Sequence, residues 1–579
     1  MSIARRRLPF GAERIDDART RFRLWAPSAS RVDVVIGGTP HAMTHEAGGW
    51  YEIVAPAPHG TRYRYRIDGK LDVPDPASRA QDGGIDGESI VVDPAAYRWR
   101  VPQGSGRRWS DAVIYELHVG LYGGFAGVEA KLDDLAALGI TAIELMPIAQ
   151  FPGTRNWGYD GVLPFAPAAS YGTPDALKSL VDAAHERGLM VLLDVVYNHF
   201  GPEGNYLGAY AGPFFDATKQ TPWGAAIDFS RPEVRQFFLE NAQYWLDEFR
   251  IDGLRLDAVH AIGDASFVAE LVERITSRHA DGAPRHAILE NEENDAALLA
   301  GPHAAQWNDD AHHVLHVLLS GERDGYYADY AERATAHLAR WLAEGFVFQG
   351  EPMAYREGRA RGSPSASLAP TVFVNALQNH DQIGNRALGD RLIEAADARA
   401  LDAAYALLLL NPQIPMLFMG EDWGSRVPFL YFTDYSGELA AAVRDGRRRE
   451  FTRFAAFAAT DIPDPNAIST FEASRPDFPR ADNAFRARIR ELIALRRTHV
   501  TPRLVDARSL GCRIVGDAAV DARWRMGDGR VLRIAVNFGT AEAPIDDIGT
   551  APFFVSAGAI TSATLAPATC AAWLLDAPA

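Results

Sequence analysis

The first hundred residues alternate between hydrophobic and polar positions in short runs separated by glycine-containing turns. Alternation with a period of two is the pattern of a β-strand with one buried face. Turns at this spacing are typical of a small β-sandwich. The clearest runs are 21–25, 31–36, 50–54 and 62–67. We therefore predict an N-terminal β-sandwich domain over residues 1–101, with a linker-like stretch at 102–106.

From Trp109 onward, continuous apolar runs alternate with segments whose apolar residues recur every three or four positions. Continuous apolar runs are typical of strands buried on both faces, as in parallel sheets. The longer period is that of amphipathic helices. The predicted strands are 113–118, 142–146, 190–195, 253–256, 287–289, 372–376 and 416–419.

Local signals give several of the helices between these strands their boundaries. Apolar residues spaced over 128–138 predict one helix, which should end at Gly139. The pair Thr-Pro at 173–174 predicts an N-cap followed by a first helical proline. The sequence Ser-Arg-Pro-Glu at 230–233 predicts a capping box, and a closing helix is expected near 483–497.

Roughly eight strand–helix units over nearly 400 residues predict a (β/α)₈ TIM barrel over 102–500. An open doubly wound sheet is the alternative, and it is disfavoured because no glycine-rich phosphate loop follows the early strands. After residue 501 the chain returns to short strands such as 531–536, with Gly and Asp turns. The predicted class is therefore α/β, with the barrel preceded by one β-sandwich and followed by a second over 501–579.

Composition and charge narrow the functional classes. Of the 579 residues, 47% are hydrophobic and 23% are charged, which is the balance of a soluble globular protein. A net charge of −17 makes nucleic acid and anionic membranes poor partners. The only cysteines, Cys512 and Cys570, exclude a disulfide framework or a cysteine-rich metal site and fit a reducing compartment.

Neither a membrane anchor nor a secretory signal is expected from the sequence. No stretch is long and apolar enough to span a membrane. The three arginines at 5–7 are not followed by the apolar run of a signal peptide. We therefore expect a cytoplasmic location.

Acidic residues recur at the carboxyl ends of the predicted strands. Asp257 and Glu290 each follow a strand directly, and Asp381 lies shortly after a third. Asn-His at 198–199 follows another. In a barrel, the residues at these ends line one mouth. The alternative, that the three acids are helix caps or solvated loop residues, does not account for their recurrence at strand ends.

Two of these carboxylates have surroundings that favour different protonation states. Arg255 precedes Asp257 by two residues, so both side chains lie on one face of the strand. A neighbouring arginine favours the ionised carboxylate, as a nucleophile requires. Glu290 lies between apolar and acidic neighbours, which favour the protonated form of a general acid. Glycosidic cleavage needs such a pair. Asp381 can bind sugar hydroxyls, and Tyr159 can stack on the sugar.

These motifs resemble the four sequence regions of the α-amylase superfamily of retaining glycosidases. The matching stretches are 194–199, 253–257, Glu290 and 379–381, in the family's order, and the resemblance extends over roughly 109–497. It implies that Asp257 is the nucleophile, Glu290 the acid/base and Asp381 the stabiliser of the transition state. It also implies substrate contacts from Tyr159, His199, Arg255 and His380. We further predict that Trp157 and Gln382 bind substrate.

Within this superfamily, several segments resemble the enzymes that release trehalose from malto-oligosyltrehalose. The segments are 197–206, 306–313, 321–327 and 380–386. This resemblance implies hydrolysis of the α-1,4 bond next to the terminal trehalose, with malto-oligosyltrehalose as the substrate and trehalose as a product. No cofactor is expected. The N-terminal domain resembles the domain shared by branching and debranching enzymes.

The segment 306–313 is the candidate for recognising the trehalose end. Polar groups shaped for particular hydroxyls reject ligands that leave them unpaired. The residues expected to contact sugar are Trp307, by stacking, and one of Asn308, Asp309 and Asp310, through hydroxyls. A solvated acidic loop is the alternative. More acids follow Glu290 than the family leads us to expect, which leaves open the roles of residues 292 and 293.

A calcium site is a further question, because many α-amylases hold one near the asparagine that corresponds to Asn198. Calcium takes about six to eight oxygen ligands. The sequence offers no recognisable set of that size near Asn198, and the trehalose-releasing relatives are not generally calcium enzymes. We therefore expect no required metal.

Two other functions are compatible with parts of this pattern. A branching or debranching enzyme of the same superfamily would use the same three carboxylates, so these residues do not separate it from a trehalose-releasing hydrolase. A carbohydrate-binding or scaffold protein built on an inactive barrel is the second alternative. It is disfavoured because all three carboxylates are present together with Arg255 and both histidines.

Overall fold

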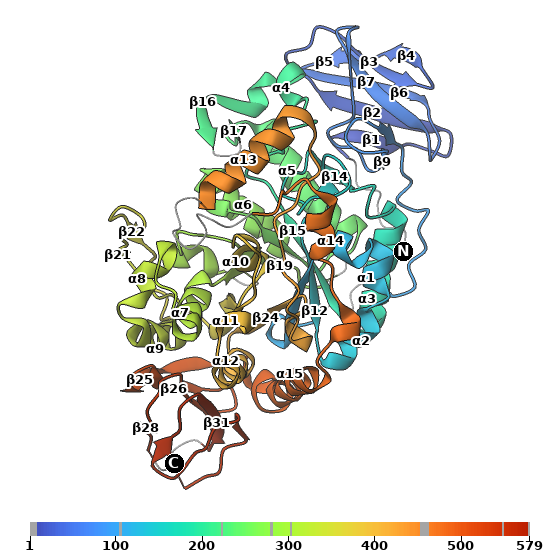
Figure 1. The fold of residues 1–579 in the computed structure, drawn as a ribbon. Helices are drawn as coiled ribbons and strands as arrows, with labels where there is room; N and C mark the ends of the chain where they lie inside the picture. Colours follow the sequence, from blue (N-terminus) through green and yellow to red (C-terminus); the bar gives the residue numbers. More distant parts are fainter. Residues whose placement is uncertain are drawn as a thin grey trace.

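The structure, a computed structural model, describes residues 8–102, 107–221, 224–277, 282–301, 304–451, 462–546 and 549–576. The arginines at 5–7 and most of the linker-like stretch at 102–106 lie outside these ranges. Figure 1 shows an N-terminal β domain in blue, a central barrel, and a C-terminal β domain in red at the opposite end. The predicted fold class is confirmed.

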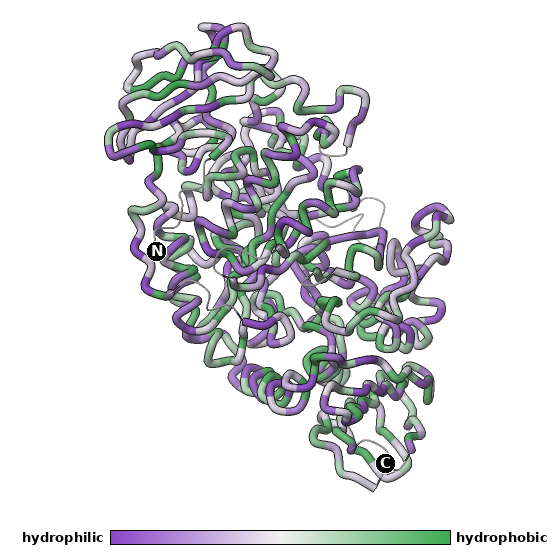
Figure 2. The backbone as a smooth tube through the Cα atoms, turned by 180° about the vertical axis from the view of Figure 1, so that it is seen from behind, coloured by the Kyte–Doolittle hydropathy of each residue, from purple (hydrophilic) through white to green (hydrophobic). Residues whose placement is uncertain are grey.

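The N-terminal domain consists of two antiparallel sheets. The first contains β1 (Gly11–Arg14), β2 (Arg19–Trp25), β6 (Trp50–Pro56) and β5 (Thr44–Glu46). The second contains β4 (Thr39–Ala42), β3 (Val32–Ile36), β7 (Arg62–Ile67), β10 (Glu88–Ile90), β9 (Gln81–Asp82) and β8 (Leu71–Val73). In β7, Tyr63, Tyr65 and Ile67 are buried and the intervening arginines are not. In Figure 2, hydrophobic and hydrophilic stretches are interleaved along the strands of this domain, at the top of the view.

Eight parallel strands close the central barrel. In order, they are β11 (Ile114–Leu117), β12 (Ala142–Leu145), β15 (Met190–Val195), β18 (Gly253–Leu256), β19 (His286–Leu289), β20 (Ala304–Trp307), β23 (Phe373–Asn375) and β24 (Ile414–Phe418). Seven correspond to predicted strands. The strand β20 was not predicted, because its four residues include two alanines, which have little strand preference.

The interior of the barrel changes from apolar to charged along the strands. One cluster of buried residues includes Ile114, Ala142, Leu192 and Ile288, each from a different strand. Side chains two positions apart on a strand share a face. The next inward residues are therefore, in the same order, Glu116, Glu144, Asp194 and Glu290. The charged layer above the apolar cluster is the floor of the site.

The helices surround the barrel and fill the connections between its strands (Figure 1). The longer ones are α3 (Pro174–Glu186), α5 (Pro232–Glu248), α6 (Ala265–Thr276), α7 (Asp309–Ser320), α9 (Ala334–Glu344), α12 (Ala398–Leu410), α13 (Gly437–Phe451) and α15 (Asn483–Leu495). The shorter ones are α1 (Phe125–Glu129), α2 (Leu132–Leu138), α4 (Leu207–Tyr210), α8 (Ala328–Ala331), α10 (His380–Gly384), α11 (Leu392–Ala395) and α14 (Ile468–Ala473). Among the described residues, no helix has the length and apolar character needed to cross a membrane.

Two helix predictions need correction and one is confirmed. The single helix expected over 128–138 is two helices, α1 and α2, although Gly139 does end the second one, at φ 106°. Thr173 caps α3 by accepting from the amide of Ala176, as predicted. The prediction of a capping box at 230–233 is wrong. The hydroxyl of Ser230 donates to Asp228 instead, and no described side chain caps α5.

The C-terminal domain is an antiparallel β-structure. Its five-stranded sheet contains β25 (Arg508–Gly516), β26 (Ala519–Arg525), β27 (Val531–Asn537), β31 (Thr569–Leu575) and β29 (Phe554–Val555), and β28 (Ala543–Pro544) pairs with β30 (Thr564–Leu565). Three two-stranded sheets lie in barrel connections among the described residues: β13 (Ala149–Gln150) with β14 (Leu163–Pro167), β16 (Phe215–Thr221) with β17 (Gly224–Ile227), and β21 (Glu351–Pro352) with β22 (Ala360–Arg361).

Candidate active site

One buried arginine connects three carboxylates at the mouth of the barrel. Arg255, on β18, is fully buried. Its Nη1 donates to Asp194 at 2.8 Å and to Asp257 at 2.9 Å. Its Nη2 lies 2.8 Å from an oxygen of Glu290. A single planar group therefore holds the predicted nucleophile and the predicted acid within reach of each other.

Other donors fix each of these two carboxylates. The side-chain amide of Asn198 donates to the Oδ2 of Asp257 at 2.8 Å. The backbone amide of Ala258 donates to the Oε2 of Glu290 at 2.8 Å. Ala258 has φ 39°, which is a strained conformation for a residue other than glycine. The left-handed turn directs the amide toward Glu290 just beyond the end of β18.

A second network approaches the same floor through His380. One ring nitrogen of His380 pairs with Glu116, and the other lies 2.8 Å from the hydroxyl of Tyr159. Tyr159 donates that hydroxyl to Asp194 at 2.6 Å. Burial alone would lower the pKa of His380, but the charges of Asp381 and Glu116 outweigh it and raise the pKa to about 9. The ring is therefore a cation at neutral pH.

Asp194 is the acid on which the two networks meet. Burial raises its pKa to about 7, although Arg255 works in the opposite direction. Tyr159 and Arg255 both contact its Oδ2. The ring of Tyr159 also stacks on that of His380, with centroids 5.2 Å apart. This packing fixes the orientation of both rings.

The predicted stabiliser Asp381 is held by the start of a short helix. Asn379 caps α10, and its side chain accepts from the amides of Asp381 and Gln382. The side chain of Gln382 in turn accepts from the amide of Asn379 at 2.9 Å. Both Asp381 and Gln382 line the main cavity. The Asn-His-Asp motif at 379–381 therefore acts as a cap that presents a carboxylate.

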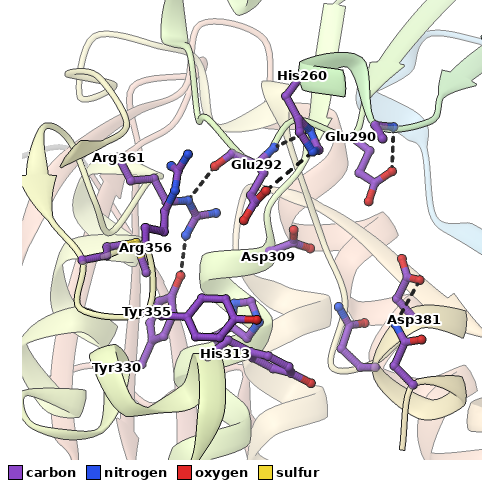
Figure 3. Close-up of a pocket in the computed structure, with 15 residues that line it drawn as sticks. His260, Glu290, Glu292, Asp309, His313, Tyr330, Tyr355, Arg356, Arg361 and Asp381 are labelled. Carbon is purple, nitrogen blue, oxygen red and sulfur yellow. Dashed lines mark hydrogen bonds and ion pairs between the residues drawn. The ribbon is translucent and has the colours of Figure 1, made fainter. Parts of the chain in front are cut away.

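The cavity next to this floor extends away from the strand ends. Its lining residues are Ala258, His260, Glu290, Glu292, Asp309, His313, Tyr326, Tyr330, Met353, Tyr355, Arg356, Arg361, Asp381, Gln382 and Asn385. Figure 3 shows Glu290, Asp309 and Asp381 facing this space. Asp257 and Tyr159 do not line it, but both keep part of their surface exposed.

Several predicted substrate contacts lie beneath the site. Trp157 packs edge-on against His380, with centroids 5.6 Å apart, and its indole donates to the carbonyl of Leu430. The ring of Trp307 lies under Arg255, with the guanidinium carbon 4.1 Å from its centroid. His199 is buried, and its ring contacts Asn198 and the carbonyl of Tyr159. Burial lowers the pKa of His199.

The segment 306–313 is not a solvated acidic loop, so that alternative is wrong. It forms the end of β20 and the start of α7. Asn308 donates to the carbonyl of Gly345. Asp310 is fully buried and accepts from Asn294, Tyr330, Val347 and Arg361. Of the three candidates for binding hydroxyls, only Asp309 lines the cavity, and burial raises its pKa to about 7.

Sequence reasoning missed most of one cavity wall. The additional lining residues with polar or aromatic side chains are His260, His313, Tyr326, Tyr330, Tyr355, Arg356 and Arg361. Most come from the long connection between β20 and β23, where no strand end marks them. Two segments singled out in the sequence pointed to this wall: 306–313, which contains His313, and 321–327, which contains Tyr326.

The described residues offer no recognisable metal centre. No group of three or more His, Cys, Asp or Glu side chains within them is arranged to hold a metal ion. Asn198, the position considered for calcium, uses its amide nitrogen on Asp257 and its oxygen on His199. That no metal is required stays a prediction.

A closed (β/α)₈ barrel with acids and one arginine at its strand ends defines a class, the glycoside hydrolases of the α-amylase superfamily. The protein-family model described as "Alpha amylase, catalytic domain" matches residues 84–211. Carbohydrate-binding module 48, the isoamylase N-terminal domain, matches 9–96, and a domain of unknown function, DUF3459, matches 507–573.

Curated relatives identify the family more closely. A malto-oligosyltrehalose trehalohydrolase from Deinococcus radiodurans is 42% identical, over 83% of this chain and 81% of that protein. One from Rhizobium sp. is 40% identical, over 92% of this chain and 93% of that protein. The chain belongs to the malto-oligosyltrehalose trehalohydrolase family.

Solved structures agree with this fold. A putative α-amylase from Salmonella typhimurium has a TM-score of 0.93 and 41% identity, and covers 98% of this chain and 99% of its own. A pullulanase from Paenibacillus barengoltzii has a TM-score of 0.73 at 21% identity, covers 98% of this chain and 95% of its own, and shares the fold.

Among the curated sequence relatives, a branching enzyme from Nocardia farcinica is 35% identical, but the match covers only 58% of that protein.

Proposed function

We propose that this chain is a retaining hydrolase that cleaves the α-1,4-glucosidic bond next to the terminal trehalose of malto-oligosyltrehalose, releasing trehalose and a malto-oligosaccharide. The observation that carries the proposal is its membership of the trehalohydrolase family over more than four-fifths of the chain. The arrangement of acids around Arg255 supports hydrolysis of a glycosidic bond.

In the proposed reaction, Asp257 attacks the anomeric carbon while Glu290 protonates the oxygen of the departing sugar. A covalent glycosyl-enzyme forms, and Glu290 then takes a proton from the water that hydrolyses it. Two successive displacements retain the configuration at the anomeric carbon. The bonds from Arg255 and Asn198 orient Asp257 for attack.

The third carboxylate and the aromatic residues have supporting roles in this proposal. Asp381 stabilises the positive charge that develops on the sugar ring. Tyr159 stacks on the ring under attack, and His380 holds Tyr159 in place. The residues proposed to support the substrate site from beneath are Trp157, His199, Trp307 and Asn308, and Asp309 and Gln382 are the ones proposed to bind hydroxyls directly.

The wider setting follows from the proposed reaction. Its substrate and products are neutral sugars, which suits a chain with a net charge of −17. The hydrolysis needs two carboxylates and water, so we propose that it uses no cofactor and no required metal. We also propose a cytoplasmic location, where trehalose would be made from glucans.

The test of this function compares two substrates of similar size. Purified enzyme is incubated with maltotriosyltrehalose and with maltopentaose, and the products are separated by chromatography. The first should be cut with the higher kcat/KM and should release free trehalose. If the kcat/KM values for the two substrates are equal, the proposed specificity is wrong and the protein is a general glucan hydrolase. New α-1,6 branches from a linear glucan would indicate the branching activity instead.

A further inference from the structure

Glu116, near the end of β11, contacts the first residue of α10 in two ways. One carboxylate oxygen pairs with Nδ1 of the His380 ring, and the other accepts from the backbone amide of His380 at 3.3 Å. Glu116 and His380 are each only 1% exposed. Asp381, the next residue of the helix, lines the cavity. Glu116 therefore holds the base of the element that presents this carboxylate.

The other ring nitrogen of His380 faces two hydrogen-bond acceptors. Its Nε2 lies 2.8 Å from the hydroxyl of Tyr159 and 3.4 Å from Oδ1 of Asp381. The hydroxyl of Tyr159 uses its single proton on Oδ2 of Asp194, at 2.6 Å, so its oxygen is left to accept. An ionised carboxylate accepts and does not donate. Nε2 therefore needs a proton of its own.

Both ring nitrogens of His380 accordingly carry protons. A neutral imidazole has one N–H donor, whereas the imidazolium cation has two. The hydrogen-bond geometry thus requires the cation, in agreement with the pKa of about 9. The ionisable groups that act on the ring are the acids Glu116, Glu144, Asp194 and Asp381 and the bases Arg255 and His118.

A comparison with Glu144 shows how Glu116 differs from the other acids of the same layer. Glu144 lies directly beside Glu116 in the register of β11 and β12. Neither of its carboxyl oxygens has a hydrogen-bond partner among the described residues. Burial raises the pKa of Glu144 well above its ordinary value, so this residue is uncharged at neutral pH. Glu144 is therefore unsuited to balance the charge of His380, whereas Glu116 contacts the ring directly.

We propose that Glu116 is a positioning residue for the hydrolysis, which keeps the His380 ring doubly protonated and in one orientation and so fixes Tyr159 and Asp381 around the sugar under attack. This inference rests on the proposed function for the identity of the reaction. A ring without the second proton would turn a lone pair toward Tyr159 and the carboxylate of Asp381, and these groups would move apart. Activity should therefore require the cation.

The experiment measures kcat/KM for maltotriosyltrehalose between about pH 5 and about pH 8, a range in which an ordinary histidine loses its proton. Glu116→Gln keeps the size of the side chain and an acceptor for Nδ1 but removes the charge, so the pKa of His380 should fall. Glu116→Asp keeps the charge. Glu144→Gln is the matched control, because it changes an uncharged carboxyl group in the same layer. Circular dichroism at each pH checks folding.

The kcat/KM of Glu116→Gln relative to wild type should fall as the pH rises, because the ring loses its proton. The fall should be at least about tenfold across the range, as expected for loss of a hydrogen bond to a charged group. For Glu116→Asp and Glu144→Gln, the corresponding ratio should not change with pH. A loss of the same size at every pH in Glu116→Gln, or a fall with pH in Glu116→Asp as well, would overturn the inference.

A double variant shows whether Glu116 acts through the ring of His380. In a protein that already carries His380→Gln, adding Glu116→Gln should cause no loss that depends on pH. A pH-dependent loss that persists in this double variant would also overturn the inference. Repeating the series with maltopentaose separates the two proposals. If wild type shows no preference for the trehalose-ended substrate, the proposed function fails, and the pH dependence on either substrate still decides the role of Glu116.

Discussion

At the scale of single residues, Arg255 is the group on which the site depends. It is a fully buried cation that contacts Asp194, Asp257 and Glu290. A buried charge is tolerated when opposite charges and hydrogen bonds surround it. The same contacts bring together carboxylates that would otherwise repel one another. The contacts that balance the charge of Arg255 therefore also position the two carboxylates proposed to be catalytic.

The proposed catalytic roles predict the effect of two conservative substitutions. Asp257→Asn removes the nucleophile, and Glu290→Gln removes the proton donor, which contributes roughly 10²–10⁴ in rate. Both variants should stay folded, because the shapes of the side chains are kept. Steady-state kinetics on maltotriosyltrehalose, with circular dichroism as the control for folding, measure these effects. Turnover like that of wild type in either variant would contradict the assignment.

A substrate with a good leaving group separates the two roles. Such a group departs with little help from a proton donor, so Glu290→Gln should lose less activity on it than on the natural bond. Asp257→Asn should be equally impaired on both substrates. An α-glucosyl fluoride of a malto-oligosaccharide provides the comparison. If Asp257→Asn instead lost less activity on the fluoride and Glu290→Gln were equally impaired on both substrates, the two roles would have to be exchanged.

The charge on His380 predicts how stability depends on pH. Its pKa rises from an ordinary value of 6.5 to about 9 in the folded protein. The folded state therefore holds this proton more tightly than the unfolded state does. The resulting stabilisation is fully present below about pH 6.5 and is lost as the pH rises through 9.

Thermal unfolding of wild type and of His380→Gln between pH 6 and pH 10 measures this contribution. The difference in Tm between the two proteins should be largest at the acidic end and should shrink as the pH passes 9. A difference that does not change with pH would mean that the ring is neutral in the folded protein, with a purely steric role.

At the scale of elements, the long connection between β20 and β23 shapes the cavity. It carries α7, α8, α9 and the hairpin of β21 and β22, residues 351–361, here called the cavity hairpin because several of its residues line the cavity. Two adjacent residues at the start of α7 have different roles. Asp309 lines the cavity, whereas Asp310 lies beneath it and accepts from Arg361 at the base of the hairpin. Neighbouring positions on a helix point about 100° apart, which explains the difference.

This arrangement predicts that Asp309→Ala and Asp310→Ala behave differently. Asp309→Ala should lower the preference for the trehalose-ended substrate without lowering Tm, because the Asp309 side chain makes no direct hydrogen bond or ion pair with another described residue. Asp310→Ala leaves Arg361 buried without its carboxylate, which costs about 3–5 kcal/mol of stability. Thermal unfolding and the two-substrate assay measure both effects. Equal Tm values for Asp310→Ala and wild type would contradict the anchoring role.

At the scale of the whole molecule, three parts share one chain. The carbohydrate-binding module 48 match covers the N-terminal sandwich, and the barrel and C-terminal sheet follow it. The proposed catalytic groups all come from the barrel and its connections. The proposed domain boundaries at 101 and 500 fall between these parts, and limited proteolysis is the measurement that locates them.

The proposed chemistry needs no metal, which predicts resistance to chelation. Activity on maltotriosyltrehalose should survive exhaustive treatment with EDTA, because the nucleophile and the acid are both protein carboxylates. A calcium-dependent α-amylase treated in parallel is the positive control for chelation. Loss of activity that added calcium restores would show that a metal is required.

The sequence by itself determined the barrel and the positions of Asp257 and Glu290. Apolar strands buried on both faces have a local signature, and the residue after such a strand lies at the mouth of the barrel. The family resemblance supplied the proposed roles of these acids. The same local reasoning failed at β20, because its short Ala-rich run lacks a distinctive pattern.

Only the tertiary structure decided which groups meet. His380 pairs with Glu116, 264 positions away, and Arg361 pairs with Asp310, 51 positions away. Such contacts have no period and no spacing in the sequence, because the path of the intervening chain sets them. The charged state of His380, the anchoring role of Asp310 and the wall formed by the cavity hairpin all follow from these long-range contacts.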